Sequence, residues 1–383
     1  MAKKSASPET HKVSIVNIGS YQPQDELNAA VLRAIELCGA SALLKRGSKV
    51  VVKPNLLLAV GPSSAITTHP AVLHAVCEWL SGLDCEIIVG DSSSQIGGAI
   101  NAFRKSGLAE VAERFGARVV DFDKEAAIRV STPNASGTVP ILGLPRMLVD
   151  ADCVISLPKL KTHMLTALTC GVKNCFGMVP GGQKRAIHAL NPDAARFSTA
   201  LVDIYEAASP DLTIVDGITC MDGFGPSFGR PRQFGIIAAG TNAAAVDYVM
   251  AGITGIGARN VATVQESIRR SLIIPERITV AGDAPRRLVR FRKALPVSRF
   301  LSAFGGKSMR VLQRLLVPSP FIDRKKCRKC GACVRICPVK VLDMDKAAGT
   351  VPAFARRGDC IHCYCCYEAC PFGAVGLSRL RRA

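Results

Sequence analysis

Short, almost continuously apolar runs alternate with segments of helical periodicity over the first 282 residues of the chain. Runs of this kind are typical of strands that are buried on both faces of a sheet. They predict strands at residues 13–19, 48–58, 85–94, 117–123, 151–161, 212–218, 234–240 and 277–283. Between them, helical spacing predicts helices at residues 25–39, 70–80, 97–115, 193–207 and 243–253. Strands that alternate with helices favour an α/β fold, built on a mainly parallel sheet that is covered by helices.

The pattern changes after Asp283, where lysine and arginine interleave with leucine, valine and phenylalanine at helix-like spacing as far as Pro320. We interpret residues 284–320 as a basic amphipathic linker, with its apolar face packed on the preceding domain and its charged side chains in water. The alternative is a surface that docks on an anionic lipid membrane or on an acidic partner protein.

One cysteine spacing occurs twice near the end of the chain. CRKCGACVRICP begins at Cys327 and CIHCYCCYEACP begins at Cys360, so each half reads Cys-x2-Cys-x2-Cys-x3-Cys-Pro. In the bacterial ferredoxin run, three closely spaced thiolates bind one [4Fe–4S] cluster and the fourth binds the other. The spacing therefore predicts two [4Fe–4S] clusters, one bound by Cys327, Cys330, Cys333 and Cys370, and the other by Cys360, Cys363, Cys366 and Cys337.

Two features of this region have an alternative, namely the type of metal and the choice of ligand cysteines. Paired CxxC motifs also form zinc ribbons, but a ribbon does not repeat an eight-cysteine pattern that ends each half in Cys-Pro. Cys365 is an additional cysteine, and keeping the spacing makes Cys366 the ligand and Cys365 a bystander; an exchange of the two is the alternative. Between the halves, residues 341–354 alternate and break at Ala-Gly, as in a short hairpin.

Charge and cysteine usage limit the cellular setting. The formal net charge is +19, and residues 283–383 hold 22 lysines and arginines against 6 acidic residues, a balance of +16. This basic part has no motif of interleaved aromatic and basic residues, which disfavours nucleic-acid binding. No apolar run reaches the roughly 18 residues of a membrane span. Sixteen cysteines and an N-terminus without an apolar signal region predict a cytoplasmic protein.

Polar residues gather at the predicted carboxyl ends of the strands, where ligands bind in open parallel sheets. Lys159, Lys161 and His163 alternate at one such end and would share a face if the strand continued. Lys173 and Asn174 follow in a glycine-rich turn. Ammonium and backbone N–H groups hold carboxylates and phosphates, so these five are the candidate catalytic residues of a positive pocket. At other strand ends, the candidate cofactor-binding residues are Lys53, Asn55, Asp91 and Asp216.

Each of these features has a structural alternative. A single lysine at a strand end can be a solvated loop charge. Cys170 and Cys175 bracket the glycine-rich turn and could reach a metal, but buried free thiols are commoner. The chain shows neither a dinucleotide-binding fingerprint nor a Walker loop.

A series of short motifs adds a family resemblance. They are, in order, VVKPNLL, THP, VGDSSS, ISLPKLKTH, GVKNCFGMVPG, IVDGITCMDGFGP and GTNAAAVDYV. In this order, the motifs resemble domain-of-unknown-function family three hundred and sixty-two, whose members are often fused to a C-terminal two-cluster ferredoxin domain. The resemblance covers residues 13–283 and, with the cysteine run, almost the entire chain. It implies an iron–sulfur protein without a settled reaction. A remote likeness to nickel-dependent lactate racemases lacks a matching set of histidines here.

We therefore predict a tail at residues 1–12, an α/β domain at 13–283, the basic linker, and a small α+β ferredoxin-like domain at 321–383. The preferred function is an iron–sulfur oxidoreductase that passes single electrons between a redox partner protein and a small anionic substrate or cofactor in the α/β domain. The alternative is a non-enzymatic electron carrier or assembly factor whose α/β domain is a recognition module. The linker leaves peripheral membrane contact as a further hypothesis.

Overall fold

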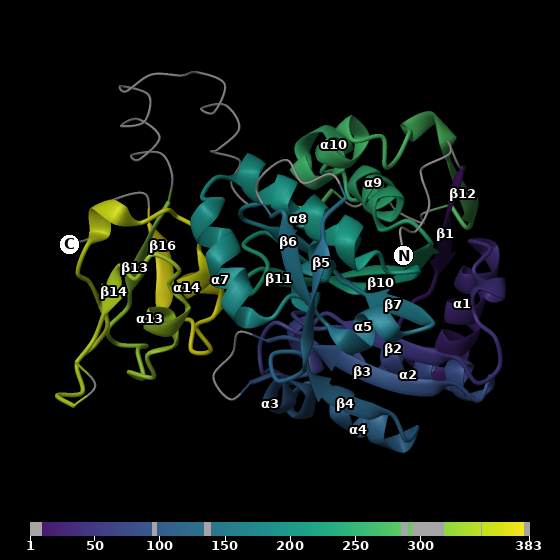
Figure 1. Cartoon of the computed structure of the whole chain (residues 1–383), viewed down its shortest axis with the longest axis horizontal. Helices are drawn as coiled ribbons and strands as arrows, with labels where there is room; N and C mark the ends of the chain where they lie inside the picture. The colour runs from purple at the N-terminus through teal and green to yellow at the C-terminus, as the bar shows by residue number, and fades with distance from the viewer. Residues whose placement is uncertain are drawn as a thin grey trace.

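The computed structural model describes residues 10–93, 98–133, 139–284, 290–292, 318–345 and 347–378. Within them, a large α/β part is followed by a small cysteine-rich part that lies beside α7 (Gly181–Leu190) (Figure 1). Most of the predicted basic linker lies outside the described residues, so its two interpretations stay predictions. In the short described stretch, Phe291 is buried with its ring centroid 5.3 Å from that of Phe234.

A ten-stranded sheet forms the centre of the large part. Its strands lie in the order β12-β1-β11-β10-β7-β2-β3-β4, and β8 pairs with β10 and β9. Neighbouring strands are parallel except in the pairs β1–β11, β10–β11 and β8–β9, which confirms the predicted α/β fold. The strands are β1 His11–Asn17, β2 Lys49–Pro54, β3 Glu86–Asp91, β4 Arg118–Asp121, β7 Cys153–Leu157, β8 Lys159–His163, β9 Ala167–Thr169, β10 Leu212–Asp222, β11 Arg230–Gly240 and β12 Ile278–Gly282.

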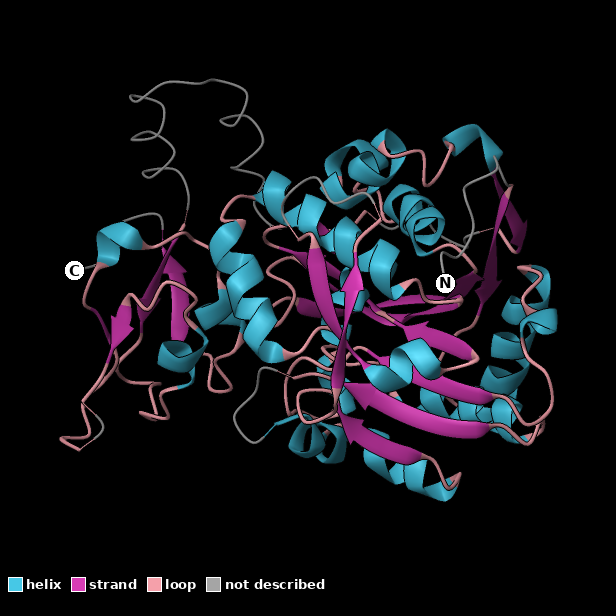
Figure 2. Ribbon diagram, viewed as in Figure 1, coloured by secondary structure: helices cyan, strands magenta, loops and turns pink. Residues whose placement is uncertain are grey.

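Helices cover both faces of this sheet (Figure 2). The strands are apolar on both sides, so that Val50 and Val52 pack into the core under α1 to α4 while Val51 packs into the core under α8, α9 and α10. The helices are α1 Gln24–Leu37, α2 Pro70–Ser81, α3 Gly98–Lys105, α4 Leu108–Arg114, α5 Arg146–Asp150, α6 Gly171–Asn174, α7, α8 Ala194–Ala208, α9 Ala243–Ile253 and α10 Ala262–Arg269.

The chain breaks two elements that the sequence predicts as continuous. The predicted helix at 97–115 is divided into α3 and α4 at Gly107, whose φ of 77° is a left-handed conformation that glycine adopts without strain. The predicted strand at 151–161 is divided into β7 and β8 at Pro158, which has no N–H to donate to a neighbouring strand. The sequence also did not predict α7, α10 or the hairpin of β5 Ala127–Ser131 with β6 Ile141–Pro145.

The small part combines two antiparallel strand pairs with short helices, which are α13 Ala332–Ile336 and α14 Cys365–Glu368. One pair joins β13 Ser319–Ile322 to β16 Val375–Ser378, and the other joins β14 Leu342–Asp343 to β15 Ala353–Phe354. Among the described residues, no helix combines the length and the apolar character needed to cross a bilayer.

The small part is held against the large part through α14. The ring centroids of Tyr367 and Phe228 are 4.6 Å apart, and the Tyr367 hydroxyl donates a long hydrogen bond to the Phe224 carbonyl at 3.5 Å. The Ser227 hydroxyl donates to the Glu368 carbonyl at 3.3 Å. Met164, at the turn after β8, packs against the apolar core of the small part. The end of β8 therefore lies directly beneath the cysteine-rich part.

Candidate functional site

A cavity of about 110 Å³ lies where the strand ends of the large part meet the small part. The small part contributes Ile336, Cys365, Glu368 and Ala369 to its wall. The large part contributes the basic and polar residues Lys53, Asn55, Asp91, Lys161, His163, Lys173, Asn174, Lys184, Arg185 and His188. Seven of the nine site residues that the sequence predicts in the α/β domain therefore line one cavity, and Lys159 and Asp216 do not.

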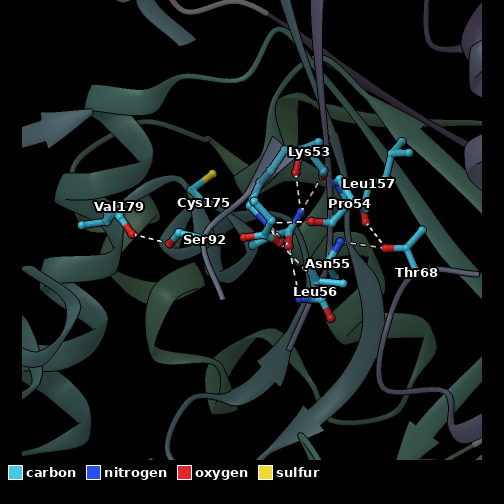
Figure 3. A network of polar contacts seen from close by, with 12 residues as sticks. Lys53, Pro54, Asn55, Leu56, Thr68, Ser92, Leu157, Cys175 and Val179 are labelled. Atoms are coloured by element: carbon cyan, nitrogen blue, oxygen red, sulfur yellow. Dashed lines mark hydrogen bonds and ion pairs between the residues drawn. The ribbon is translucent and has the colours of Figure 1, made fainter. Parts of the chain in front are cut away.

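Lys53 is fully compensated at the base of the cavity. Its Nζ donates to Asp91 Oδ2 at 2.7 Å, to the Pro54 carbonyl at 2.7 Å and to Asn174 Oδ1 at 3.1 Å (Figure 3). These acceptors match the three N–H groups of an ammonium ion. Burial raises the pKa of Asp91, and the charge of Lys53 acts against that rise. A Cβ at Gly177 would lie 2.4 Å from Asp91 Oδ1, so this ion pair requires a glycine above it.

Lys159 belongs to a separate buried network. Its Nζ lies 2.7 Å from both Asp216 Oδ2 and the Tyr21 hydroxyl, which in turn donates to Asp216 Oδ1 at 2.9 Å. The His69 backbone N–H also donates to Asp216, at 2.8 Å. Lys159 alternates with Lys161 along β8 as predicted, but its amine is taken up by Asp216 and Tyr21 and it does not line the cavity.

Lys161 is buried in the cavity wall with uncharged partners. Its Nζ donates to Asn55 Oδ1 and to the Ile66 carbonyl, each at 2.7 Å. It forms no ion pair with a carboxylate in the described part of the chain. Burial, followed by the nearby charge of Lys173, lowers the pKa of Lys161 well below its ordinary value. No carboxylate contacts this amine within the described residues, and the nearby charge of Glu368 only acts against the lowering of its pKa.

His163 presents a defined ring nitrogen to the cavity. Its Nδ1 accepts hydrogen bonds from the backbone N–H groups of Leu165 at 3.0 Å and Thr166 at 3.2 Å. The ring proton is therefore assigned to Nε2. Nε2 lies 3.3 Å from Glu368 Oε1 but without the alignment of a hydrogen bond. Burial and the charge of Lys173 lower the pKa of His163, which favours the neutral ring.

Further basic residues that line the cavity include Lys173, Lys184 and His188. Lys173 Nζ lies 4.9 Å from the ring centroid of Phe176, which is within the range of a cation–π interaction. Lys184, on α7, donates to the Ser92 carbonyl at 2.6 Å, and burial lowers its pKa to about 8. Burial lowers the pKa of His188 to about 3. The sequence did not identify the α7 residues, because their helix follows a glycine-rich segment without a clear apolar repeat.

Several buried polar atoms on this lining have no hydrogen-bond partner within the described residues. They are Asp91 Oδ1, His163 Nε2, Thr169 Oγ1 and His188 Nδ1. Buried polar atoms in proteins are nearly always paired, with protein, water or ligand. The cavity is therefore suited to a small polar ligand that offers both hydrogen-bond donors and acceptors.

The cysteines of the doubled run gather in the small part in two neighbouring groups. No disulfide bond joins any of the cysteines within the described residues. Burial, with Cys370, Cys327 and Cys330 as neighbouring thiols, raises the pKa of Cys333 to about 11. These four are the residues that the spacing assigns to the first cluster.

The second group surrounds Cys366. Burial raises the pKa of Cys366 well above its ordinary value, and the thiols that add to this rise are Cys363, Cys360, Cys337 and, from the first group, Cys333. In the first group, the Ala374 N–H donates to Cys370 Sγ at 3.2 Å, a contact of the kind that tunes cluster potentials. The donor set thus fits iron–sulfur clusters. No three His, Cys, Asp or Glu side chains of the described ranges converge on a single metal ion.

Cys365 is not assigned to either group of cysteines, and it lines the cavity together with Glu368 from the same helix. The Cys365 thiol is buried and shares a hydrogen bond with Cys363. That Cys365 is not a cluster ligand stays a prediction. Its side chain lies beside the ligand cysteines and also on the wall of the cavity.

Comparisons with known proteins agree with this division of the chain. Residues 50–252 match the family described as Domain of unknown function (DUF362), and residues 326–374 match the 4Fe-4S dicluster domain. A thylakoid-associated protein of Synechocystis sp. is 33% identical over 279 residues, which are 72% of this chain and 85% of the relative. An uncharacterized ferredoxin of Methanocaldococcus jannaschii is 38% identical over 56 residues, which are 14% of this chain and 86% of the ferredoxin.

Solved structures give weaker likenesses. The lactate racemase apoprotein from Thermoanaerobacterium thermosaccharolyticum has a TM-score of 0.42 at 14% identity, over 65% of this chain and 58% of that chain. A Thermotoga maritima protein has a TM-score of 0.37 at 15% identity, over 59% of this chain and 57% of that chain. Both are too distant to bear on the reaction.

The Lys159 network generates a prediction about stability. Lys159→Met leaves Asp216 buried without its ion-pair partner, and we expect the free energy of unfolding to fall by about 3–5 kcal/mol. Urea unfolding followed by circular dichroism measures this change. The control is Lys45→Met, at an exposed position, which should stay within about 0.5 kcal/mol. Equal stability of the two variants would mean that the network does not contribute to the fold.

Proposed function

The chain belongs to the family described as Domain of unknown function (DUF362), and from this premise we propose that it is an iron–sulfur oxidoreductase with a small anionic substrate or cofactor in the cavity. Its 4Fe-4S dicluster domain provides the capacity for electron transfer. We further propose that the domain binds two [4Fe–4S] clusters through the two groups of cysteines. A redox partner protein supplies or removes the electrons.

One observation carries this proposal: the cavity and the cysteine groups share a wall. Ile336, Cys365 and Ala369 line the cavity, and each is the sequence neighbour of a proposed cluster ligand. Those ligands are Cys337, Cys366 and Cys370. A ligand in the cavity therefore lies against the protein shell of a cluster, and positioning a redox centre against its substrate is what a protein contributes to such chemistry.

The charges of the cavity support an anionic ligand. Lys173, Lys184 and Arg185 lie on its wall, while the carboxylate of Asp91 is already paired with Lys53. Glu368 is the remaining carboxyl group on the lining, and burial raises its pKa to about 7. Lys184 is buried and Lys173 is half-buried, so their charges are costly unless an anion compensates them. Carboxylates and phosphates are the ligand classes that fit.

For localisation, we propose the cytoplasm, because a reducing compartment preserves free thiols. Contact of residues 284–320 with an anionic membrane surface is the alternative to a packed linker. The thylakoid-associated relative supports such a contact.

The cluster proposal predicts close to eight irons and eight acid-labile sulfides per chain in protein purified without oxygen. Cys330→Ser and Cys363→Ser should each lower the content mainly by one cluster, whereas Cys365→Ser should leave both clusters in place. Iron and sulfide analysis with electron paramagnetic resonance of the reduced protein measures this. Stoichiometric zinc without sulfide would contradict the proposal, and loss of a cluster in Cys365→Ser would reverse the assignment of Cys365 and Cys366.

The anion proposal predicts saturable binding that changes cluster reduction. We would screen small carboxylates and phosphate esters against the anaerobic holoprotein, then titrate the best ligand while following reduction by absorbance. Lys173→Met should weaken its binding about ten- to a hundredfold, since a hydrogen bond to a charged group contributes about 1.5–3 kcal/mol. Lys45→Met is the matched surface control. An anion that binds equally well to both variants would place the site elsewhere, and the absence of any binding would favour an electron carrier.

The same titration has a predicted pH dependence. Lys184 is charged below its pKa of about 8 and neutral above it. Anion affinity should therefore be highest below pH 8 and should fall as the pH rises through that value. Lys184→Met should bind more weakly below pH 8 and lose this step. An unchanged pH profile in Lys184→Met would show that another group causes the dependence.

A further inference from the structure

The hydrogen bonds of Lys161 differ from those of Lys53, which is buried in the same cavity lining. An uncharged amine has two N–H groups and one lone pair, whereas an ammonium ion has three N–H groups and no lone pair. Lys161 Nζ has two acceptors, Asn55 Oδ1 and the Ile66 carbonyl, each at 2.7 Å. Lys53 Nζ has three acceptors, of which Asp91 is a carboxylate. The contacts of Lys161 thus complete an uncharged amine and leave its lone pair free.

The surroundings of Lys161 favour the same state. Its side chain is 0% exposed, and no carboxylate forms an ion pair with it among the described residues. Three neighbouring lysines outweigh the one nearby carboxylate, which is Glu368. An isolated buried ammonium is strongly disfavoured, and a lysine in that position loses its proton instead. The Asn55 amide is fixed with its oxygen toward Lys161, because its Nδ2 donates to Asn174 Oδ1 at 3.3 Å. Lys161 is thereby held at the cavity wall as a nucleophile.

We propose that Lys161 forms an imine with the carbonyl group of a small anionic carbonyl compound, such as a 2-oxo acid, bound in the cavity. This inference rests on the proposed function and names the substrate class of that same site. The carboxylate of such a compound meets the positive wall formed by Lys173, Lys184 and Arg185. In that orientation, its carbonyl carbon lies next to the amine of Lys161.

The step balances without a further reactant. The Lys161 lone pair attacks the carbonyl carbon, an N–C bond forms, and the carbonyl oxygen takes up a proton that the nitrogen gives up. The resulting hydroxyl leaves as water when its C–O bond breaks, with the second proton of the amine. One amine and one carbonyl compound thus give one imine and one water.

His163 is placed to assist this step as a positioning residue. It lies two residues after Lys161 on β8, so both side chains project from the same face of the strand, and both line the cavity. Its Nε2 carries the ring proton, is buried, and has no aligned acceptor in the described part of the protein. It can donate a hydrogen bond to the carbonyl oxygen and then to the departing hydroxyl.

Trapping by reduction tests the proposal on the full-length, anaerobically prepared protein. Glyoxylate is the probe, with cyanoborohydride to reduce any imine to a stable carboxymethyl-lysine, and peptide mapping gives the rate of modification at each lysine. An ordinary lysine is uncharged in fewer than about one in a thousand molecules at pH 7. We therefore expect Lys161 to be modified at least about tenfold faster than exposed lysines such as Lys45.

Two controls connect the modification to the cavity. Glycolate matches glyoxylate in its carboxylate but lacks the carbonyl, so it should slow the modification of Lys161 without forming an adduct itself. Lys173→Met should also slow modification at Lys161, because it weakens the hold on the carboxylate, whereas Lys45→Met should not. Mapping on the unmutated protein decides the central point even if a variant folds poorly.

The outcomes separate this inference from the proposed function. Modification of Lys161 at the rate of the surface lysines overturns the imine, whatever the anion titration shows. If an anion binds and changes cluster reduction while Lys161 stays unmodified, the oxidoreductase proposal stands and Lys161 is only a hydrogen-bond donor. Fast modification of Lys161 that glycolate does not slow would also overturn the proposal, because the reaction would then not involve a carboxylate site in the cavity.

Discussion

The removal of several lysine amines from water beneath the cysteine-rich part is the constraint on which the site depends. Each buried amine needs either a counter-charge or the loss of its proton. Lys53 has Asp91 and Lys159 has Asp216, so these two lysines are bound into the structure. Among the described residues, the acceptors of Lys161 are uncharged oxygens. The same degree of burial therefore accompanies ion pairs at two positions and, at the third, the amine that we propose to be uncharged.

The small part closes one side of the cavity. Its helix α14 covers the end of β8, with Tyr367 against Phe228 and Glu368 facing His163. The cover also brings the backbone that carries the proposed cluster ligands to the cavity wall. The proposed ligand site and the proposed redox site are therefore two sides of one interface.

If the cavity binds an anion and the small part binds clusters, as proposed, the two sites are coupled energetically. A negative charge in the cavity then acts on a nearby cluster through a medium of lower effective dielectric constant than water, so it disfavours addition of an electron. By reciprocity, reduction of the cluster weakens the binding of an anion by the same factor. Release of an anionic product on reduction, or its capture on oxidation, needs no movement of the two parts.

The sequence alone determined those features that depend on neighbouring residues. Apolar runs between amphipathic segments predicted the parallel sheet, and the repeated cysteine spacing predicted the ferredoxin-like part, because both patterns reflect local geometry. Their position at the carboxyl end of a predicted strand also identified Lys161 and His163 as candidate site residues. Only the tertiary structure distinguished Lys159 from Lys161, because their partners are 57 and 106 residues away in the chain. The tertiary structure also showed that Glu368 and Lys184 line the cavity, because the cavity wall is formed by segments that are far apart in the sequence.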